Sequence, residues 1–132
     1  MSEGNELLFD VTDGIATVTI NRPEQRNAMN IAVSNGLNKI WEDIDLNPDI
    51  RVVIFTSADC GTFCAGMDLN VARGLDADSS ADWLVRLKRL YEAVRGLDKP
   101  SVAALNGVAA GAGYQLALLA DLRVGHKAAR MG

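Results

Sequence analysis

The spacing of apolar residues at the start of the chain is that of β-strands. Residues 7–12 and 15–20 are two runs rich in apolar and β-branched residues with a roughly alternating pattern. Asp13-Gly14 between them is a strong signal for a two-residue hairpin turn. The polar segment 21–27 that follows contains Pro23, which disfavours helix at the residue before it. The sequence therefore predicts a β-hairpin followed by a loop.

The pattern then changes to a helical period. Asn30 is a good N-cap, and Asn47-Pro48 ends the periodic segment. The apolar face of the predicted helix comprises Ile31, Leu37, Ile40, Trp41 and Ile44. Residues 51–56 are a short continuous apolar run, which predicts a strand that is covered on both faces and parallel to another strand.

The middle of the chain combines a loop without a period and a second amphipathic helix. Residues 57–69 are rich in small and polar residues, and such loops at strand C-termini are where open α/β sheets bind ligands. Beyond Asp78, we expect Ser79 or Ser80 to cap a helix that Gly96 and Pro100 end. Its expected apolar face comprises Leu84, Leu87, Tyr91 and Val94.

The stretch from Val102 to Asp121 predicts a strand that leads into a helix. Residues 102–105 are apolar, Asn106-Gly107 marks a turn, and an apolar helix is expected from Gly111 to Ala120. Free N–H groups and the helix dipole make such an N-terminus attractive to an oxyanion, although tight packing against a sheet explains the small residues equally well. A short strand at residues 122–125 completes an alternation that is typical of a layered α/β fold.

Composition narrows the classes of function. A chain of 132 residues is within the size of one domain, so residues 1–132 are expected to belong to one domain. With 13 basic and 17 acidic residues the net charge is −4, and no basic stripe is present, which argues against nucleic acid as a partner. No apolar run is long and uninterrupted enough for a membrane span, and the start lacks the features of a signal peptide. We therefore expect a cytoplasmic protein.

The cysteines and the single histidine give little sign of a metal or a nucleophile. Cys60 and Cys64 have the spacing C-x-x-x-C, without a second pair. We therefore expect no metal site and interpret both as ordinary thiols in or near a loop. His126 is expected to be a surface residue after the last strand, which gives a catalytic triad little support.

Three segments carry a resemblance to a known family. They read N-R-P-E-Q-R-N-A-M at 21–29, G-T-F-C-A-G-M-D-L at 61–69 and L-N-G-V-A-A-G-A-G-Y-Q-L-A at 105–117. Together, in this order and separation, they resemble the enoyl-CoA hydratase/isomerase, or crotonase, superfamily. The resemblance implies a crotonase-like fold of strand-strand-helix turns, of which this chain is about the first half. It also implies a homo-oligomer, a trimer or a hexamer.

The resemblance implies a chemistry as well. Members of this superfamily bind an acyl-CoA thioester with its carbonyl between two backbone N–H donors, which stabilise the enolate that forms. Carried over by position, the donors are the N–H groups of Met67 and Ala112. Losing one such preorganised donor typically costs about 3–4 kcal/mol. Coenzyme A would be part of the substrate, and no tightly bound cofactor is implied.

The resemblance assigns the coenzyme A contacts mainly to main chain. The residues concerned are Arg26, Ala28, Ala65, Gly66, Asp68, Leu69 and Gly111. Arg26 is in addition a candidate partner of a CoA phosphate. For Asp68, a helix N-cap is an equally good interpretation. Arg22 and Glu24 are expected to be ordinary solvated charges.

One position departs from the hydratase pattern. Hydratases of this superfamily use two glutamates, and the first of those positions is Gln115 here. A glutamine amide cannot act as a general base, although it can orient water or substrate. The second acidic position would lie just past Gly132. The sequence thus favours an isomerase-like over a hydratase-like enzyme, with decarboxylase and hydrolase open. The alternative is a non-catalytic acyl-CoA-binding or assembly protein.

Overall fold

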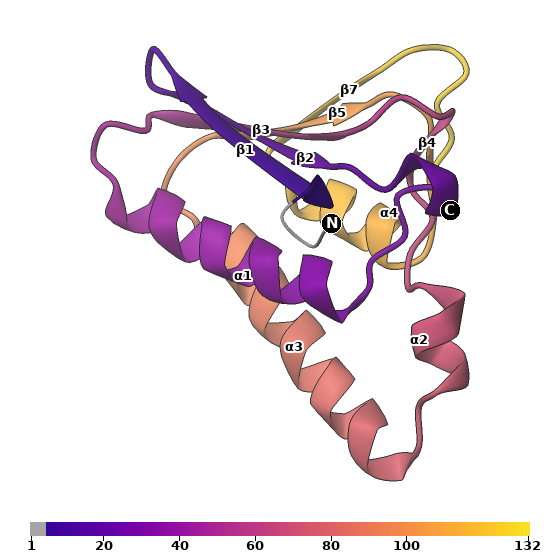
Figure 1. Ribbon diagram of the computed structural model, residues 1–132. Coiled ribbons are helices and arrows are strands. Elements are labelled where there is room, and N and C mark those ends of the chain that lie inside the picture. The colour runs from indigo at the N-terminus through magenta and orange to yellow at the C-terminus, as the bar shows by residue number, and fades with distance from the viewer. Residues whose placement is uncertain (1–4) are drawn as a thin grey trace.

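The structure, a computed structural model, describes residues 5–132 and is built on one five-stranded sheet (Figure 1). Residues 1–4, part of the segment expected to lack a signal peptide, lie outside the described residues. The strand order is β1-β2-β3-β5-β7. The strands are β1 (Leu7–Thr12), β2 (Ile15–Ile20), β3 (Val52–Ser57), β5 (Ser101–Leu105) and β7 (Leu122–Gly125). Only the β1–β2 pair is antiparallel, so the predicted parallel pairing of β3 is confirmed on both of its sides.

The predicted hairpin is present with the expected turn. Thr12 pairs with Ile15, and both residues between them have positive φ, 53° at Asp13 and 80° at Gly14. Two consecutive positive φ angles define a type I′ turn, whose twist matches that of the strands it joins.

Three helices lie on one side of the sheet (Figure 1). They are α1 (Ile31–Leu46), α3 (Ala77–Gly96) and α4 (Ala112–Leu119). Asn30 caps α1 as predicted, because its side chain accepts a hydrogen bond from the N–H of Val33. The expectation that β3 is covered on both faces was wrong. Val53 and Phe55 are buried under the helices, whereas Ile54 on the opposite face is partly exposed.

Helix α3 begins earlier than predicted, and its buried face matches the predicted one in part: Val94 is buried as expected, and Leu87 and Tyr91 are partly buried against the core. Asp76 is the N-cap, and it forms a reciprocal capping box with Ser79, which is the third residue of the helix rather than its cap. The buried residues are Trp83, Leu90 and Val94, whereas Leu84, expected on the apolar face, is 64% exposed. Apolar residues lie on more than one face of this helix, so its packing against α1 decides which of them are buried.

Short elements connect the main ones. A second sheet pairs β4 (Thr62–Cys64) with β6 (Val108–Ala109) in parallel, and the 3₁₀ turn η2 (Pro23–Gln25) lies in a segment predicted as a loop. Helix α2 (Leu69–Arg73) begins where the predicted loop 57–69 ends. Strands of two or three residues are too short to show a period. They form because the two segments are pressed together: a β-carbon at Gly107 would lie 2.2 Å from the carbonyl oxygen of Gly61.

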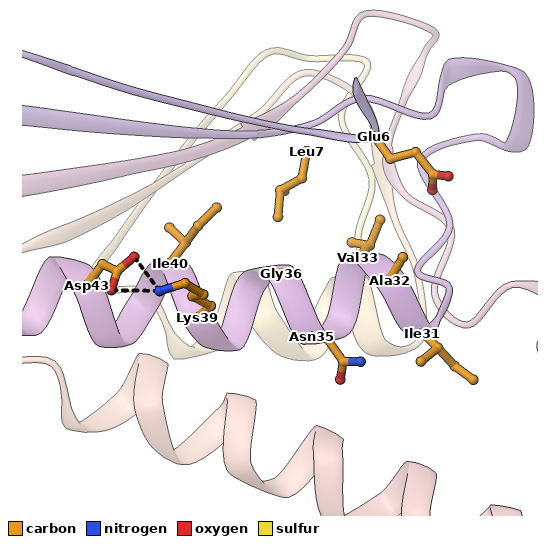
Figure 2. A pocket seen from close by; sticks show the side chains of 10 residues that line it. All are labelled: Glu6, Leu7, Ile31, Ala32, Val33, Asn35, Gly36, Lys39, Ile40 and Asp43. Carbon is orange, nitrogen blue, oxygen red and sulfur yellow. Dashed lines mark hydrogen bonds and ion pairs between the residues drawn. The ribbon is translucent and has the colours of Figure 1, made fainter. Parts of the chain in front are cut away.

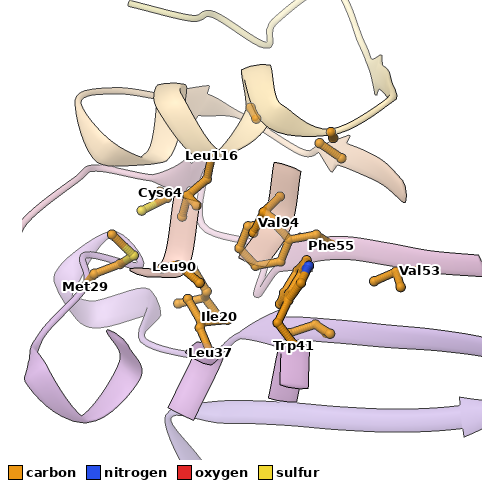
Figure 3. Close-up of a cluster of buried hydrophobic side chains, with 14 of the residues drawn as sticks. Ile20, Met29, Leu37, Trp41, Val53, Phe55, Cys64, Leu90, Val94 and Leu116 are labelled. Atoms are coloured by element: carbon orange, nitrogen blue, oxygen red, sulfur yellow. The ribbon is translucent and has the colours of Figure 1, made fainter. Parts of the chain in front are cut away.

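The core fills the space between the sheet and the three helices (Figure 3). Trp41 of α1 packs edge-on against Phe55 of β3 with ring centroids 5.4 Å apart, and Phe55 packs likewise against Phe63 of β4 at 5.3 Å. Burial of each such side chain contributes about 1.5–3 kcal/mol, and aromatic edge contacts add to it. This chain of rings joins α1, the main sheet and the small sheet into one core. Among residues 5–132, every helix is too short or too polar to cross a bilayer.

Candidate functional site

The first two segments of the family-like pattern lie side by side. The N–H of Ala65 donates to the carbonyl of Arg26 (3.2 Å), and the N–H of Met29 donates to the carbonyl of Gly66 (2.8 Å). The N–H of Asp68 donates in turn to the carbonyl of Met29 (2.9 Å). Residues 26–29 are therefore bonded along residues 65–68, although more than thirty residues separate them in the sequence.

The third segment, residues 105–117, contacts the second segment directly after the small β4–β6 sheet. The N–H of Ala110 donates to the carbonyl of Cys64 (2.9 Å). A β-carbon on Gly66, which has a φ of +100°, would lie 3.1 Å from the carbonyl oxygen of Ala110 and 3.5 Å from the nitrogen of Ala112. Only glycine allows both this backbone conformation and this close approach. Gly66 and Ala112, predicted in separate parts of the site, are thus neighbours.

A tight turn starts helix α4. Gly111 has φ 55° and ψ −124°, and the N–H of Gly113 donates to the carbonyl of Ala110 (3.0 Å). These values are those of the first central residue of a type II′ turn, about +60° and −120°, which strongly favours glycine. Ala112, the second central residue, has no positive φ. The Cβ of Ala112 is therefore compatible with the turn, and the residue with the positive φ is Gly111.

The directions of two N–H groups follow from their peptide planes. The Gly66 carbonyl accepts from Met29, and the Gly111 carbonyl accepts from Gln115 (3.0 Å). In a trans peptide the N–H points opposite to the carbonyl, so the N–H of Met67 points away from Met29, and that of Ala112 points out of the helix start. Within residues 5–132, neither N–H has a hydrogen-bond acceptor. Each is therefore a candidate donor to a ligand.

Arg22 is not the solvated charge that the sequence suggested. Its side chain is 11% exposed, and its guanidinium pairs with the carboxylates of Glu6 (2.8 Å) and Asp68 (3.0 Å). It also donates to the carbonyl of Ala28 (2.6 Å). A single sequence gives no signal of this pairing, because the partners lie 16 and 46 residues away. Glu24, by contrast, is exposed as expected.

Asp68 is a buried structural group. Its Oδ1 accepts from the N–H of Asn70 (2.8 Å), so it is the N-cap of α2, the alternative that the sequence left open. Burial opposes ionisation, but the Arg22 hydrogen bond and charge and the backbone N–H groups outweigh it and lower the pKa of Asp68 below its ordinary 3.8. The carboxylate is therefore charged at neutral pH and occupied by protein donors.

The other predicted coenzyme A residues differ in accessibility. Arg26, Ala65, Leu69 and Gly111 are exposed, whereas Ala28 and Gly66 are buried, so any contact that those two make must use main chain. Asn27, which the sequence did not single out, is fully buried and donates to the carbonyls of Ala58 and Thr62 (both 2.9 Å). It fixes the turn that presents Arg26.

Gln115 lies one turn into α4, and its side chain faces a groove between α3 and α4. The groove has a volume of about 510 Å³ and includes Leu84, Leu87, Tyr91, Arg95 and Leu119 in its lining. The hydroxyl of Tyr91 donates a hydrogen bond to Oε1 of Gln115. Burial, with a smaller effect of the neighbouring Cys64, raises the pKa of Tyr91, which keeps this donor protonated. The sequence predicted Tyr91 as a core residue and missed this contact.

A larger groove of about 710 Å³ lies between β1 and α1 (Figure 2). Its apolar lining includes Leu7 and Ile40, and the ion pair of Lys39 with Asp43 lies at its rim. None of the residues that the sequence assigned to the site lines it, so its size alone does not make it the site.

The two cysteines differ in burial, and the histidine is exposed. Cys60 is exposed, and burial raises the pKa of the Cys64 thiol to about 11. His126 is exposed, as predicted. Among residues 5–132, His, Cys, Asp and Glu side chains form no group of three that could hold a metal ion.

Comparison with known proteins identifies the family of the chain. The sequence pattern of the enoyl-CoA hydratase/isomerase family matches residues 10–132. Bacillus subtilis YngF, named as an enoyl-CoA hydratase/isomerase, is 36% identical over 130 residues, which are 98% of this chain and 50% of that protein. The (E)-benzylidenesuccinyl-CoA hydratase of Thauera aromatica is 33% identical over 94% of this chain and 48% of its own length.

Solved structures show the same fold. An enoyl-CoA hydratase/isomerase family protein from Hyphomonas neptunium superposes with a TM-score of 0.92 at 28% identity, over 100% of this chain and 51% of that one. The enoyl-CoA hydratase from Bacillus anthracis gives 0.90 at 31% identity, over 94% and 48%. The fold is crotonase-like. The chain belongs to the enoyl-CoA hydratase/isomerase family, and it spans about half the length of the relatives that it matches.

Proposed function

We propose that this chain binds an acyl-CoA thioester and holds its carbonyl oxygen between the N–H groups of Met67 and Ala112. The observation that carries the proposal is the close approach of Gly66 to Ala112, which places two backbone donors on adjoining turns; neither donor has an acceptor among residues 5–132. The family membership supports the substrate class. The helix dipole of α4 adds partial positive charge at the second donor.

Such a pair of donors favours enolate chemistry. When a base removes the proton next to the thioester carbonyl, the electron pair moves onto the carbonyl oxygen, where two fixed N–H groups stabilise it without reorganisation. Gln115 cannot be that base, because its amide does not take up a proton at neutral pH. Its Oε1 accepts from Tyr91, and its NH₂ group can in addition donate to a substrate or a water molecule and so orient it.

The neutral Gln115 favours an isomerase-like reaction over hydration. Moving a double bond along the acyl chain needs one group that carries a proton between two carbons, whereas hydration also needs a water to be activated. The same neutral residue supports a second candidate, an acyl-CoA-binding protein without catalysis. Both candidates use the same two N–H donors, and they differ only in turnover.

The test uses the protein at its full natural length. A conjugated 2,4-dienoyl-CoA bound with its carbonyl between two N–H donors should absorb at longer wavelength than in water, because the donors polarise the conjugated system. Turnover of a 3-enoyl-CoA to the 2-enoyl isomer would support the isomerase, and a red shift without turnover of either isomer would support the binding protein. Absence of a red shift at saturation would overturn the proposal.

A further inference from the structure

We propose that Arg22 and Asp68 are positioning residues that hold the N–H of Met67 in its orientation. This inference rests on the proposed function, since it concerns one of the two donors. Both side chains are taken up by protein partners, so the role we infer is not a side-chain contact with substrate. Their role is to fix the two backbone segments between which Met67 lies.

Arg22 ties three parts of the chain together. Its Nε pairs with Glu6 just before β1, and its Nη1 donates both to the carbonyl of Ala28 and to Oδ2 of Asp68. The planar guanidinium presents donors in a fixed geometry, so these three partners cannot shift independently. The side chain is nearly buried, which protects the pair from screening by solvent ions.

Asp68, the residue directly after Met67, is held from two sides. Its carboxylate holds Arg22 and the N–H of Asn70, and its own N–H donates to the carbonyl of Met29. On the other side of Met67, the carbonyl of Gly66 is held by the N–H of Met29. Since the Gly66 carbonyl and the Met67 N–H share one peptide plane, the network that fixes one fixes the other.

The attraction between the opposite charges of Arg22 and Asp68 restricts the motion of this network. If Asp68 becomes a neutral amide, Oδ1 can still cap α2, but the attraction to Arg22 is lost and the guanidinium keeps only Glu6 as an ionic partner. We expect the 66–68 segment to gain freedom, so that the Met67 donor spends less time aligned with the oxyanion. Proximity effects are sensitive to displacements of about 1 Å.

The experiment compares matched neutralisations in the full-length protein. Asp68→Asn removes a buried charge, and Asp43→Asn removes the charge from the exposed pair with Lys39, whose side chain is 75% exposed. For each variant, the red shift of bound 2,4-dienoyl-CoA is measured beside the affinity for coenzyme A, which lacks the carbonyl. If the enzyme turns over, kcat and KM are added.

Asp68→Asn should lower the red shift by about half and kcat by about tenfold, equivalent to a loss of roughly 1.4 kcal/mol of transition-state stabilisation. Its affinity for coenzyme A should change by less than about threefold, and Asp43→Asn should match the wild type. Equal red shifts in Asp68→Asn and wild type would overturn this inference while leaving the proposed function intact. A wild type without a red shift overturns the proposed function itself.

Two further variants keep the test valid if Asp68→Asn does not fold. Arg22→Lys retains the charge but cannot reach all three partners, and Glu6→Gln weakens the hold on Arg22 from a site whose side chain is 29% exposed. Both should lower the red shift less than Asp68→Asn and in the same direction. A folded Arg22→Lys and a folded Glu6→Gln that both keep the full red shift would contradict the positioning role.

Discussion

Gly66 approaches Ala110 so closely that a β-carbon on Gly66 would lie 3.1 Å from the Ala110 carbonyl oxygen. This contact joins the turn after β4 to the turn that starts α4. The positive φ of Gly66, +100°, makes the site doubly intolerant of a side chain.

Gly66→Ala is therefore expected to destabilise the protein by about 1–3 kcal/mol, from backbone strain and from the contact. Gly61→Ala isolates the strain, because Gly61 has φ +79° but open space around it. Gly96→Ala at the end of α3 is the control without strain or close contact. It should stabilise the protein by up to about 1 kcal/mol. Denaturant unfolding measures all three, and equal stabilities of Gly66→Ala and Gly96→Ala would refute the expectation.

Gln115 is predicted to control which reaction the site supports. Gln115→Ala should slow an isomerase about tenfold, because a neutral hydrogen bond is lost. Gln115→Glu should raise the hydration rate of a short 2-enoyl-CoA, since the carboxylate can exchange protons with water and Tyr91 can still donate to it. Rapid hydration by the wild type would show that a neutral residue here does not exclude that reaction.

Lys99 is predicted to stabilise the end of α1. Its ammonium donates to the carbonyls of Ile44 and Asn47, the last of which is the C-cap of the helix. Lys99→Met should lower the free energy of unfolding by about 1–2 kcal/mol, because charged donors to helix C-terminal carbonyls are among the stronger surface interactions. Lys39→Met removes a lysine from an exposed pair within α1 and should cost under about 0.5 kcal/mol. Thermal or urea unfolding measures both variants. A loss of stability in Lys39→Met as large as that in Lys99→Met would contradict this prediction.

The two cysteines should differ sharply in reactivity. Cys60 is exposed, whereas Cys64 is buried with its pKa raised to about 11, so it carries almost no thiolate at pH 8. Iodoacetamide at pH 8 should label Cys60 in the native protein and both residues after denaturation. Mass spectrometry of the peptides reads the result, and equal labelling of Cys64 in the native state would show that this thiol is not protected.

Stability should depend on Asp68 at acid pH. The folded-state pKa of Asp68 lies below its ordinary 3.8, so its charge stabilises the folded state fully above that ordinary value. The contribution is lost as the pH falls through the lower, folded-state pKa. Asp68→Asn should therefore lose stability relative to wild type at pH 7, and the difference should shrink in the range below pH 3.8. A difference that stays constant from neutral to acid pH would contradict this assignment.

The sequence by itself determined the elements whose signals are local. Asp13-Gly14 specifies a type I′ turn, Asn30 caps α1, and the step from an apolar strand to small residues at 111–113 specifies the start of α4. These features depend on backbone preferences and hydrogen bonds within a few residues, so they are readable without knowing the fold. Through the family resemblance, the motifs also predicted that three distant segments contribute to one site.

Only the tertiary structure decided the features that need distant partners. β4 and β6 exist because two short segments are pressed together, and α3 buries Trp83 instead of Leu84 because α1 packs on that side. Arg22 looks like a solvated charge in the sequence, yet two carboxylates 16 and 46 residues away bury and neutralise it. No local preference encodes such pairings, since their free energy arises only when the folded chain removes both partners from water.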